Sequence, residues 1–391
     1  MKSIIINFKF QINLYDTIKF FFFFSFIYFN VIDFFNDSFL IKPYYEMIKL
    51  DEYFRICNKN TLIEKKIFKK VNDPKISIIT PIFNKGITLP RYLKSIQNQP
   101  FNDLEIIFID DFSTDNTLNI INELKNFDER IILIKNKKKR GTLMSRNIGA
   151  LKSKSEFLLF VDPDDLISEN ILNYTYKLAK RFDYDLIRFN IYMGHFDLNL
   201  PEIVTVLKNE PLYKPNVFLY LFYGFGRLLQ LDYFITNKLI KKKIFIKAIN
   251  SINEYFLKQF MIDCEDGLIN FMLYKYCDSL YFTRRIGYYY VVTKESITHQ
   301  SSDFKKRLKS NFLYFQFIFK STKNNNIEKN IANYIFSEIF SRREDDIIKL
   351  LKNLSSEFNF YIKTINLYLQ NDFIPLNSKL ILKKLKRIIN L

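Results

Sequence analysis

The chain of 391 residues contains no tryptophan, two histidines, three cysteines and eight glycines. The cysteines, Cys57, Cys264 and Cys277, show no paired spacing, so the sequence predicts neither a disulfide framework nor a zinc site. His195 and His299 are too few and too far apart to form a histidine metal cluster. These absences exclude the disulfide-stabilised and the zinc-binding classes of protein.

A long hydrophobic run is also missing. The most apolar stretch, residues 20–29, is interrupted by Ser25 and followed by Asn30 and Asp33, whereas a membrane-spanning helix needs about 20 mostly apolar residues. No small-residue cleavage site follows it, which argues against a signal peptide. Two interpretations of the N-terminal extension, residues 1–73, stay open: a marginal membrane anchor or a buried amphipathic helix.

Basic residues outnumber acidic ones by 59 to 41, which gives a formal net charge of +18. Such a charge favours polyanions, nucleotides or anionic lipid as partners, but it also fits an ordinary Lys-rich surface. Residues 301–391 are predicted to form a largely helical, basic C-terminal region. Its last part, residues 379–391, has a basic amphipathic pattern that would suit either a peripheral membrane contact or packing on its own domain.

Apolar, β-branched runs alternate with segments of helical spacing from residue 74 onward. The predicted strands are 75–80, 104–109, 130–134, 157–161 and 185–189, and the predicted helices are 89–97, 114–126, 142–151 and 168–181. Beyond residue 200 the alternation fades, with helices predicted at 233–247 and 266–276 and a last strand at 288–292. This order predicts an α/β fold with a mostly parallel sheet and helices on both faces.

Carboxylates follow two of these strands at the point where each strand ends. Asp162, Asp164 and Asp165 come after the apolar run 157–161, and Asp110 and Asp111 come after the strand at 104–109. We expect the two strands to be neighbours, so that both clusters reach the carboxyl edge of the sheet, where open α/β sheets bind ligands. A divalent cation would relieve the repulsion within the triplet, although a solvated acidic turn and helix capping explain such residues as well.

Four short motifs in one order carry a resemblance to a known family. They consist of Pro81, Phe83 and Asn84; Asp110, Asp111, Ser113, Asp115 and Thr117; Gly141, Arg146, Asn147 and Gly149; and Asp162, Asp164 and Asp165. Residues 74–190 resemble the nucleotide-sugar-binding half of family 2 glycosyltransferases, which have the GT-A fold. The resemblance implies a glycosyltransferase domain over residues 74–300, with its acceptor half at 191–300.

The resemblance also implies roles for individual residues on the donor side. Asp111 would contact the nucleobase, and Asp162 would hold the ribose. Asp164 and Asp165 would contact Mn²⁺ or Mg²⁺ bound to the donor diphosphate, where a cation offsets the charge of the leaving group. The remaining nucleotide-binding residues implied by the motifs are Pro81, Phe83, Asn84 and Arg146.

Transfer also needs a base to remove the proton from the acceptor hydroxyl, and the resemblance implies that this base is a carboxylate. Glu265 and Asp266 match the acidic pair of the family's acceptor region, and Asp266 is the expected general base, with Glu265 in reserve. The alternative interpretation is an acidic pair at a helix N-terminus. The implied reaction is a single, inverting displacement from a nucleotide-sugar, UDP-linked in this prediction, to a hydroxyl of a glycan, lipid or protein. Nucleic acid is not an expected partner.

Three positions depart from the family pattern: Phe112, Pro163 and Val291. A chain without tryptophan also lacks the Gln-x-x-Arg-Trp motif of processive synthases, so transfer of a single sugar is expected. Two other classes stay open. A nucleotidyltransferase would need a Gly-rich, Arg-containing loop after the first strand, which residues 81–86 lack, and a catalytically inactive relative would bind the donor without turnover. The sequence leaves open whether the protein is cytoplasmic or membrane-associated.

Overall fold

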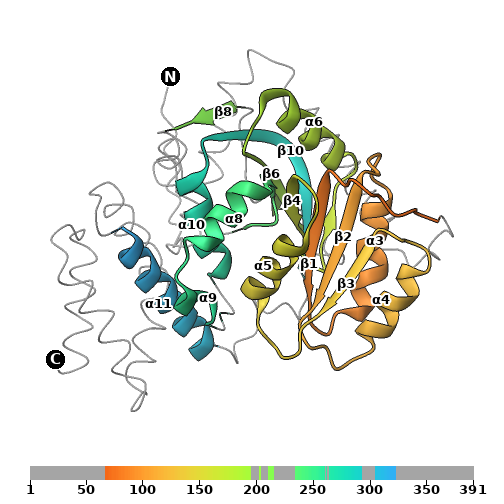
Figure 1. Cartoon of the computed structure of the whole chain (residues 1–391), viewed down its shortest axis with the longest axis horizontal. Coiled ribbons are helices and arrows are strands. Elements are labelled where there is room, and N and C mark those ends of the chain that lie inside the picture. The colour runs from red at the N-terminus through yellow and green to blue at the C-terminus, as the bar shows by residue number, and fades with distance from the viewer. Residues whose placement is uncertain are drawn as a thin grey trace, which may run out of the picture. The chain divides into compact units, whose positions relative to one another are not determined.

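A computed structural model describes residues 67–194, 202–203, 210–214, 234–259, 261, 264–292 and 304–322 (Figure 1). The elements on the donor side are β1 (Ile76–Ile82), η1 (Gly86–Thr88), α3 (Leu89–Gln97), β2 (Leu104–Asp110), α4 (Thr117–Lys125), β3 (Ile131–Lys135), α5 (Thr142–Lys152), β4 (Phe157–Phe160), β5 (Leu166–Ile167) and α6 (Ile171–Phe182). They are followed by β6 (Leu186–Gly194), β7 (Glu202–Ile203), β8 (Glu210–Tyr213), β9 (Lys238–Lys241), α8 (Lys242–Asn250), α9 (Glu254–Leu257), α10 (Glu265–Tyr276), β10 (Ser279–Val291) and α11 (Phe304–Ser321).

The strands of the described part form one sheet in the order β3-β2-β1-β4-β9-β6-β10-β5, with β7 paired to β6 and β8 to β10. Strands β1 to β4 are parallel to one another. β9 runs antiparallel between β4 and β6, and β10 runs parallel to β6. The predicted α/β fold with a mostly parallel sheet is therefore confirmed.

Helices bury both faces of this sheet (Figure 1). Leu158 and Phe160 of β4 pack into the core beneath α5, α8 and α10, whereas Phe157 and Leu159 pack into the core beneath α3, α4 and α6. A strand covered on both faces needs apolar residues at every position, and this is why the run at 157–161 is unbroken. Gly149 lets α5 lie close on β1, since a Cβ atom there would stand 2.5 Å from a methyl carbon of Ile79.

Two details of the prediction were wrong. β2 and β4 are not neighbours, because β1 lies between them and pairs with both. The predicted helix at 233–247 is instead strand β9 followed by α8, because residues 238–241 fill the gap between β4 and β6. Pairing with two strands outweighs a helical pattern in a segment this short.

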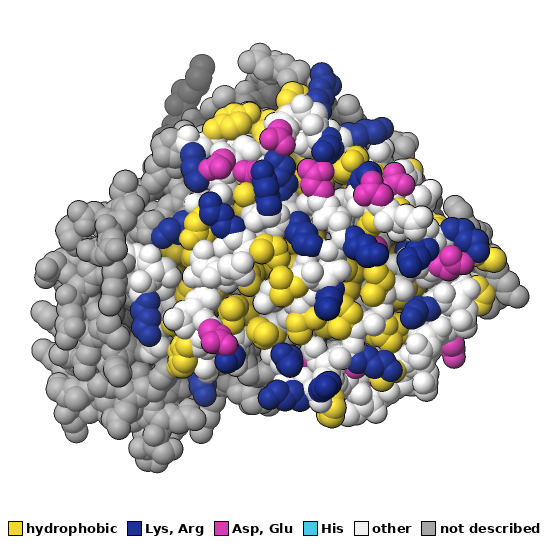
Figure 2. Space-filling model, in the orientation of Figure 1, with side chains coloured by type: hydrophobic (Ala, Val, Ile, Leu, Met, Phe, Trp, Pro, Cys, Tyr) yellow, Lys and Arg dark blue, Asp and Glu magenta, His cyan; other side chains and the backbone are white. Residues whose placement is uncertain are grey.

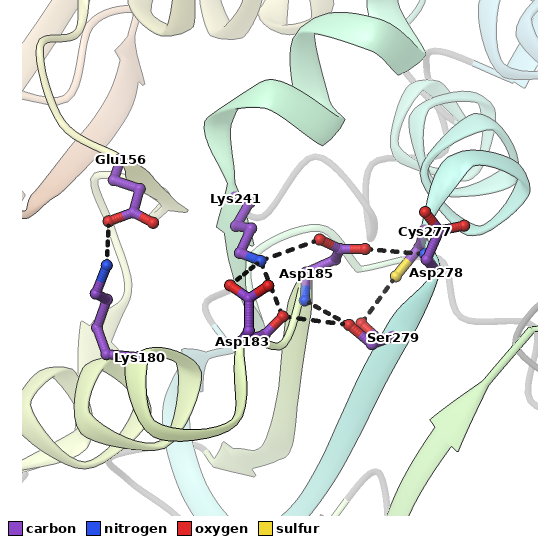
Figure 3. Close-up of polar contacts among 8 residues, drawn as sticks. All are labelled: Glu156, Lys180, Asp183, Asp185, Lys241, Cys277, Asp278 and Ser279. Atoms are coloured by element: carbon purple, nitrogen blue, oxygen red, sulfur yellow. Dashed lines mark hydrogen bonds and ion pairs between the residues drawn. The ribbon is translucent and has the colours of Figure 1, made fainter.

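An ion-pair cluster ties the end of β9 to the beginning of β6 (Figure 3). The Lys241 ammonium, only 4% exposed, lies 2.7 Å from Asp183 and 3.3 Å from Asp185. Asp185 is 8% exposed, and its second oxygen accepts the backbone N–H of Asp278 at 2.9 Å. Asp183 is 90% exposed, so water can solvate its charge. Asp185 is buried, so the charge of that residue depends on Lys241.

Lys241→Met is therefore expected to lower the free energy of unfolding by about 3–5 kcal/mol, the usual cost of removing one partner of a buried ion pair. Urea unfolding followed by circular dichroism measures the change. Lys180→Met is the matched control, because its pair with Glu156 is about half exposed on both sides and should contribute little. The double variant Lys241→Met, Asp185→Asn should recover much of the loss. Equal midpoints for Lys241→Met and Lys180→Met would contradict the assignment.

Several predictions fall outside the described residues: the candidate anchor at 20–29, most of the extension 1–73, and the basic tail at 379–391. Within the part that is described, no helix has the length and apolar character needed to cross a bilayer. Figure 2 shows the Lys and Arg side chains of one face spread among apolar and acidic ones rather than gathered in a single patch. On that face the positive charge resembles an ordinary Lys-rich surface.

Candidate functional site

The carboxyl ends of β1, β2 and β4 meet at one edge of the sheet, and the first acidic cluster lies there. Asp110 ends β2 opposite Ile82 of β1, and the next N–H, that of Asp111, donates to the Ile82 carbonyl at 2.7 Å. Asp110 is buried, and its carboxylate accepts the backbone N–H of Ser113 at 3.3 Å. Asp110 thus shapes the turn, while Asp111 points to the neighbouring loop.

Asp111 organises the loop that follows β3. Its Oδ1 accepts from the Asn136 side-chain amide at 2.9 Å and from the Arg140 N–H at 2.8 Å, and its Oδ2 accepts from the Gly141 N–H at 2.8 Å. Asn136 is buried, and it also donates to the Ser145 hydroxyl at 3.2 Å. Sequence reasoning missed Asn136, although its position directly after β3, at the same edge as Asp111, was an available signal.

Pro81, Phe83 and Asn84 end β1 and begin the next loop. Pro81 is the partner of Ile109 in the β1–β2 register. Asn84 has the left-handed φ of 52° that asparagine tolerates, and its Oδ1 accepts the Thr114 N–H at 2.8 Å, so it fastens the loop after β1 to the loop after β2. Phe83 is 37% exposed, and the Lys139 ammonium lies 3.4 Å from its ring centroid. The motif therefore contributes one fastening residue and one accessible aromatic ring.

The acidic triplet follows β4 and is held from two sides. Asp165 is buried, and it accepts from the Tyr288 hydroxyl at 2.6 Å and from the Val291 N–H at 2.9 Å, so β10 holds both of its oxygens. The Asp164 carboxylate lies 2.7 Å from the Lys85 ammonium and is 25% exposed. The Asp162 N–H donates to the Tyr288 hydroxyl at 3.2 Å. Tyr288, fully buried, is a second site residue that sequence reasoning missed.

Negative charge is concentrated in this loop. Burial raises the pKa of Asp162, and the charges of Asp266 and Asp164 raise it further, while Arg146 opposes them. Burial, followed by the charges of Asp164 and Asp162, raises the pKa of Asp165 well above its ordinary range. Ionised carboxylates at this position are costly without a cation, which makes the loop a suitable place to bind one.

Arg146 brings the donor-side and acceptor-side residues together. Its guanidinium, 2% exposed, lies 3.0 Å from Asp162 Oδ1 through Nη2 and contacts Asp266 Oδ1 through Nη1. Glu265 lies 3.9 Å from the same Nη1. Asp266 and Glu265 form the first turn of α10, whereas Arg146 belongs to α5. The structure thus unites four predicted site residues that lie up to 120 positions apart in the chain.

Comparisons with known proteins show what this chain is similar to. Residues 77–247 match the model of the family described as Glycosyl transferase family 2. Glycosyltransferase GlyG of Streptococcus pneumoniae is 32% identical over 117 residues, which are 30% of this chain and 39% of that protein. The GalNAc(5)-diNAcBac-PP-undecaprenol beta-1,3-glucosyltransferase of Campylobacter jejuni is 41% identical over 101 residues, 26% of this chain and 33% of that protein.

The solved structures that resemble this chain include Staphylococcus aureus TarS 1–349 in complex with UDP-GlcNAc, with a TM-score of 0.60 at 19% identity over 81% of this chain and 88% of that chain. The complex of the same protein with UDP gives a TM-score of 0.59 at 18% identity. At this identity the likeness establishes the fold, which is GT-A as predicted. The chain spans less than half the length of the curated relatives named above. Residues 77–247 of the chain, with the motifs at this edge of the sheet, are thus similar to glycosyl transferase family 2.

Proposed function

We propose that residues 74–300 transfer a single sugar from a UDP-linked donor to an acceptor hydroxyl, in one displacement that inverts the anomeric carbon. The observation that supports this most directly is the Arg146 network, which puts the donor-side acidic loop and a candidate general base within the span of one guanidinium. The match to the family 2 model and the UDP complexes of TarS favour a nucleotide-sugar donor. The acceptor is a hydroxyl of a glycan, lipid or protein.

The base subsite is assigned to Asp111, Asn136 and Phe83. A carboxylate and a primary amide can together pair with the imide edge of uracil: Asp111 would accept the imide N–H on a remaining lone pair, and the Asn136 amide would exchange its bond to the Ser145 hydroxyl for a uracil carbonyl. Asp111 and Asn136 already lie 2.9 Å apart at the carboxyl edge of the sheet. The exposed Phe83 ring at the end of β1 offers a face on which the base can stack. Lys139, now over that ring, would give way to the base.

The carboxylates of the acidic loop fit a divalent cation with few protein ligands. Among the described residues, no three acidic, Cys or His side chains converge into a preformed metal site. Lys85 and Arg146 engage one oxygen each of Asp164 and Asp162, and no described residue donates to the second oxygen of either. We therefore assign Asp164 and Asp162 as ligands of Mn²⁺ or Mg²⁺, which often keep water and phosphate oxygens besides one or two carboxylates.

Asp165, the other predicted metal contact, has both oxygens hydrogen-bonded to β10. Its proposed role is to hold the loop in place so that Asp164 faces the donor. When bound, the cation would neutralise the charge that develops on the diphosphate leaving group. On the acceptor side, Asp266 would take the proton from the attacking hydroxyl, and no covalent intermediate with the protein is needed.

A binding and turnover screen on the full chain tests the proposal. Nucleotide sugars are offered with and without Mn²⁺ or Mg²⁺, and binding and the released nucleotide are measured. Metal-dependent release of UDP supports a glycosyltransferase. Release of pyrophosphate would favour a nucleotidyltransferase instead. Donor binding without turnover, over a broad set of hydroxyl acceptors, would indicate an inactive relative.

Phe83→Trp provides a direct test of the base subsite, because the chain has no other tryptophan to contribute background fluorescence. Stacking of the base on the new indole is expected to quench its emission when UDP is added with Mn²⁺. Aromatic–base stacking is typically worth about 1–3 kcal/mol, so the ring at this position should also strengthen binding. Fluorescence titration with UDP measures both effects.

Ile87→Trp is the matched control for this experiment. Ile87 belongs to the same connection between β1 and α3 and is 89% exposed, but it has no part in the proposed subsite. Its emission should not respond to UDP. If calorimetry detects UDP binding to the Phe83→Trp variant and its emission stays constant, Phe83 does not stack on the base.

A further inference from the structure

Arg146 is buried at a junction between three separate elements. It belongs to α5, Asp162 follows β4, and Asp266 lies in the first turn of α10. The two Nη atoms of the guanidinium are divided between these carboxylates, one for each. A planar fork with donors on both sides can hold two carboxylates at once, whereas a lysine ammonium acts as a single point of charge.

The electrostatics favour a permanent bridge. Burial alone would lower the pKa of the Arg146 guanidinium, but Asp266, Asp162 and Glu265 together raise it above its ordinary value. The group therefore stays charged at every pH at which the protein is folded. A buried cation of this kind is retained only where several carboxylates compensate its desolvation.

Asp266 is held on both of its oxygens. Oδ1 accepts from Arg146, and Oδ2 accepts from the backbone N–H of Ile235 at 3.2 Å. Ile235 is fully buried and immediately precedes the segment that leads into β9, so this second contact is also firmly placed. Two donors from different parts of the fold thus fix the plane of the Asp266 carboxylate. The remaining lone pairs of its oxygens are available to the hydroxyl of the sugar acceptor.

We infer that Arg146 is a positioning residue: it acts through Asp266, whose carboxylate it aims at the acceptor, and it ties that carboxylate to the donor loop through Asp162. This inference rests on the proposed function and refines it, because the sequence motif alone places Arg146 among the donor contacts. A general base must stand within hydrogen-bond reach of the proton it removes. Arg146 supplies that alignment and couples it to the loop that receives the donor.

Arg146→Lys keeps the charge and removes the fork. One ammonium is shorter and lacks the two separate nitrogens that now meet Asp162 and Asp266, so we expect the base to lose its alignment. We expect kcat for release of UDP from its nucleotide sugar to fall about 100-fold, the usual effect of a misplaced catalytic group. The KM for the donor and the calorimetric affinity for UDP with Mn²⁺ should stay within about threefold, a change of less than 1 kcal/mol, because a positioning residue acts through Asp266 rather than on the donor.

Arg130→Lys is the matched control. Arg130 is an equally buried arginine that binds Asp128 through two nitrogens, at 2.8 and 2.7 Å, in the turn before β3. Replacing it creates the same chemical change away from the site. It should lower thermal stability to a similar extent and leave kcat unchanged, which separates positioning from a general loss of stability.

The rate of a double variant distinguishes a positioning role from a purely structural one. If Arg146 works through Asp266, then Arg146→Lys adds no further loss of rate to Asp266→Asn in single-turnover measurements. If the rate losses of the two single variants multiply in the double variant, the inference is overturned. A tenfold weaker affinity for UDP in Arg146→Lys would also overturn it, because it would make Arg146 a direct donor contact. If the wild-type chain turns over no donor, the proposed function fails, and the UDP affinity still decides between the two roles of Arg146.

Discussion

Replacing Asp266 by asparagine is expected to slow sugar transfer by about 10²–10⁴-fold, the usual contribution of a general base. The substitution keeps the size and shape of the side chain but removes the group that takes the proton. Asparagine can still accept the Ile235 N–H with its carbonyl oxygen, so the beginning of α10 should stay in place. Transfer rates of the purified variant, measured with saturating donor, provide the test.

The affinity of the Asp266→Asn variant for UDP distinguishes a base from a donor contact. Unchanged affinity with Mn²⁺ present supports the role of Asp266 on the acceptor side. Glu265→Gln is the natural control, because Glu265 is the neighbouring carboxylate, 3.9 Å from the same Arg146 nitrogen. If Glu265→Gln loses transfer and Asp266→Asn keeps it, Glu265 is the base. Loss of UDP binding in Asp266→Asn would assign that residue to the donor side.

The strands of the donor half were predictable because of how they are buried. β1, β2 and β4 are buried at every position, so their sequences are mostly apolar, and that of β4 is apolar throughout. The prediction placed each of these strands within two residues of its observed bounds. Because parallel strands share an edge for their carboxyl ends, the placement of Asp111 and the acidic triplet at one edge of the sheet followed from the pattern, even though the strands proved to be separated by β1.

The rest of the site depends on contacts between distant segments. Tyr288 reaches Asp165 across 123 positions, and no local pattern marks a tyrosine in β10 as the partner of a carboxylate after β4. The prediction failed at β9 for a related reason. The two lysines of this strand look like solvated residues, yet Lys238 is fully buried and donates to the Phe234 carbonyl and to the Asn237 side chain. The other lysine, Lys241, pairs with Asp183 and Asp185, which lie 58 and 56 positions away. β9 itself pairs with β4 and β6, so no local pattern marked it as a strand.

Phe112 illustrates how a departure from a family pattern is accommodated. It stands where small residues are common, and it adopts a left-handed φ of 73° with its ring 51% exposed. Glycine accepts that backbone conformation without strain, whereas an aromatic residue does so at some cost. The turn keeps its shape because Asp110 accepts the Ser113 N–H and the Asp111 N–H is fixed to Ile82. The departure therefore leaves the placement of Asp111 intact.

Asp164→Ala is expected to reduce turnover by about a thousandfold or more, since Lewis-acid stabilisation of a leaving group is worth several kcal/mol. The fold should survive the change. The Asp164 backbone carbonyl accepts from Arg91 at 2.9 Å, the Pro163 carbonyl accepts from the Thr88 hydroxyl at 2.7 Å, and Asp165 remains fastened to β10. The loop thus keeps its shape when only the carboxylate is lost. Calorimetric titration of UDP over a series of Mn²⁺ concentrations should show that the metal dependence has disappeared.

Two further variants make the Asp164 result decisive. Asp115→Ala removes an exposed carboxylate of the other acidic motif, which accepts the Thr117 N–H alone among the described residues. It should leave both turnover and metal dependence nearly unchanged. Asp165→Asn separates holding the loop from binding the cation. If Asp165→Asn loses the Mn²⁺ dependence while Asp164→Ala retains it, the metal contact belongs to Asp165. Near-normal transfer by Asp164→Ala would remove Asp164 from the catalytic machinery and leave Asp162, the other carboxylate of this loop with an oxygen to offer, as the metal contact.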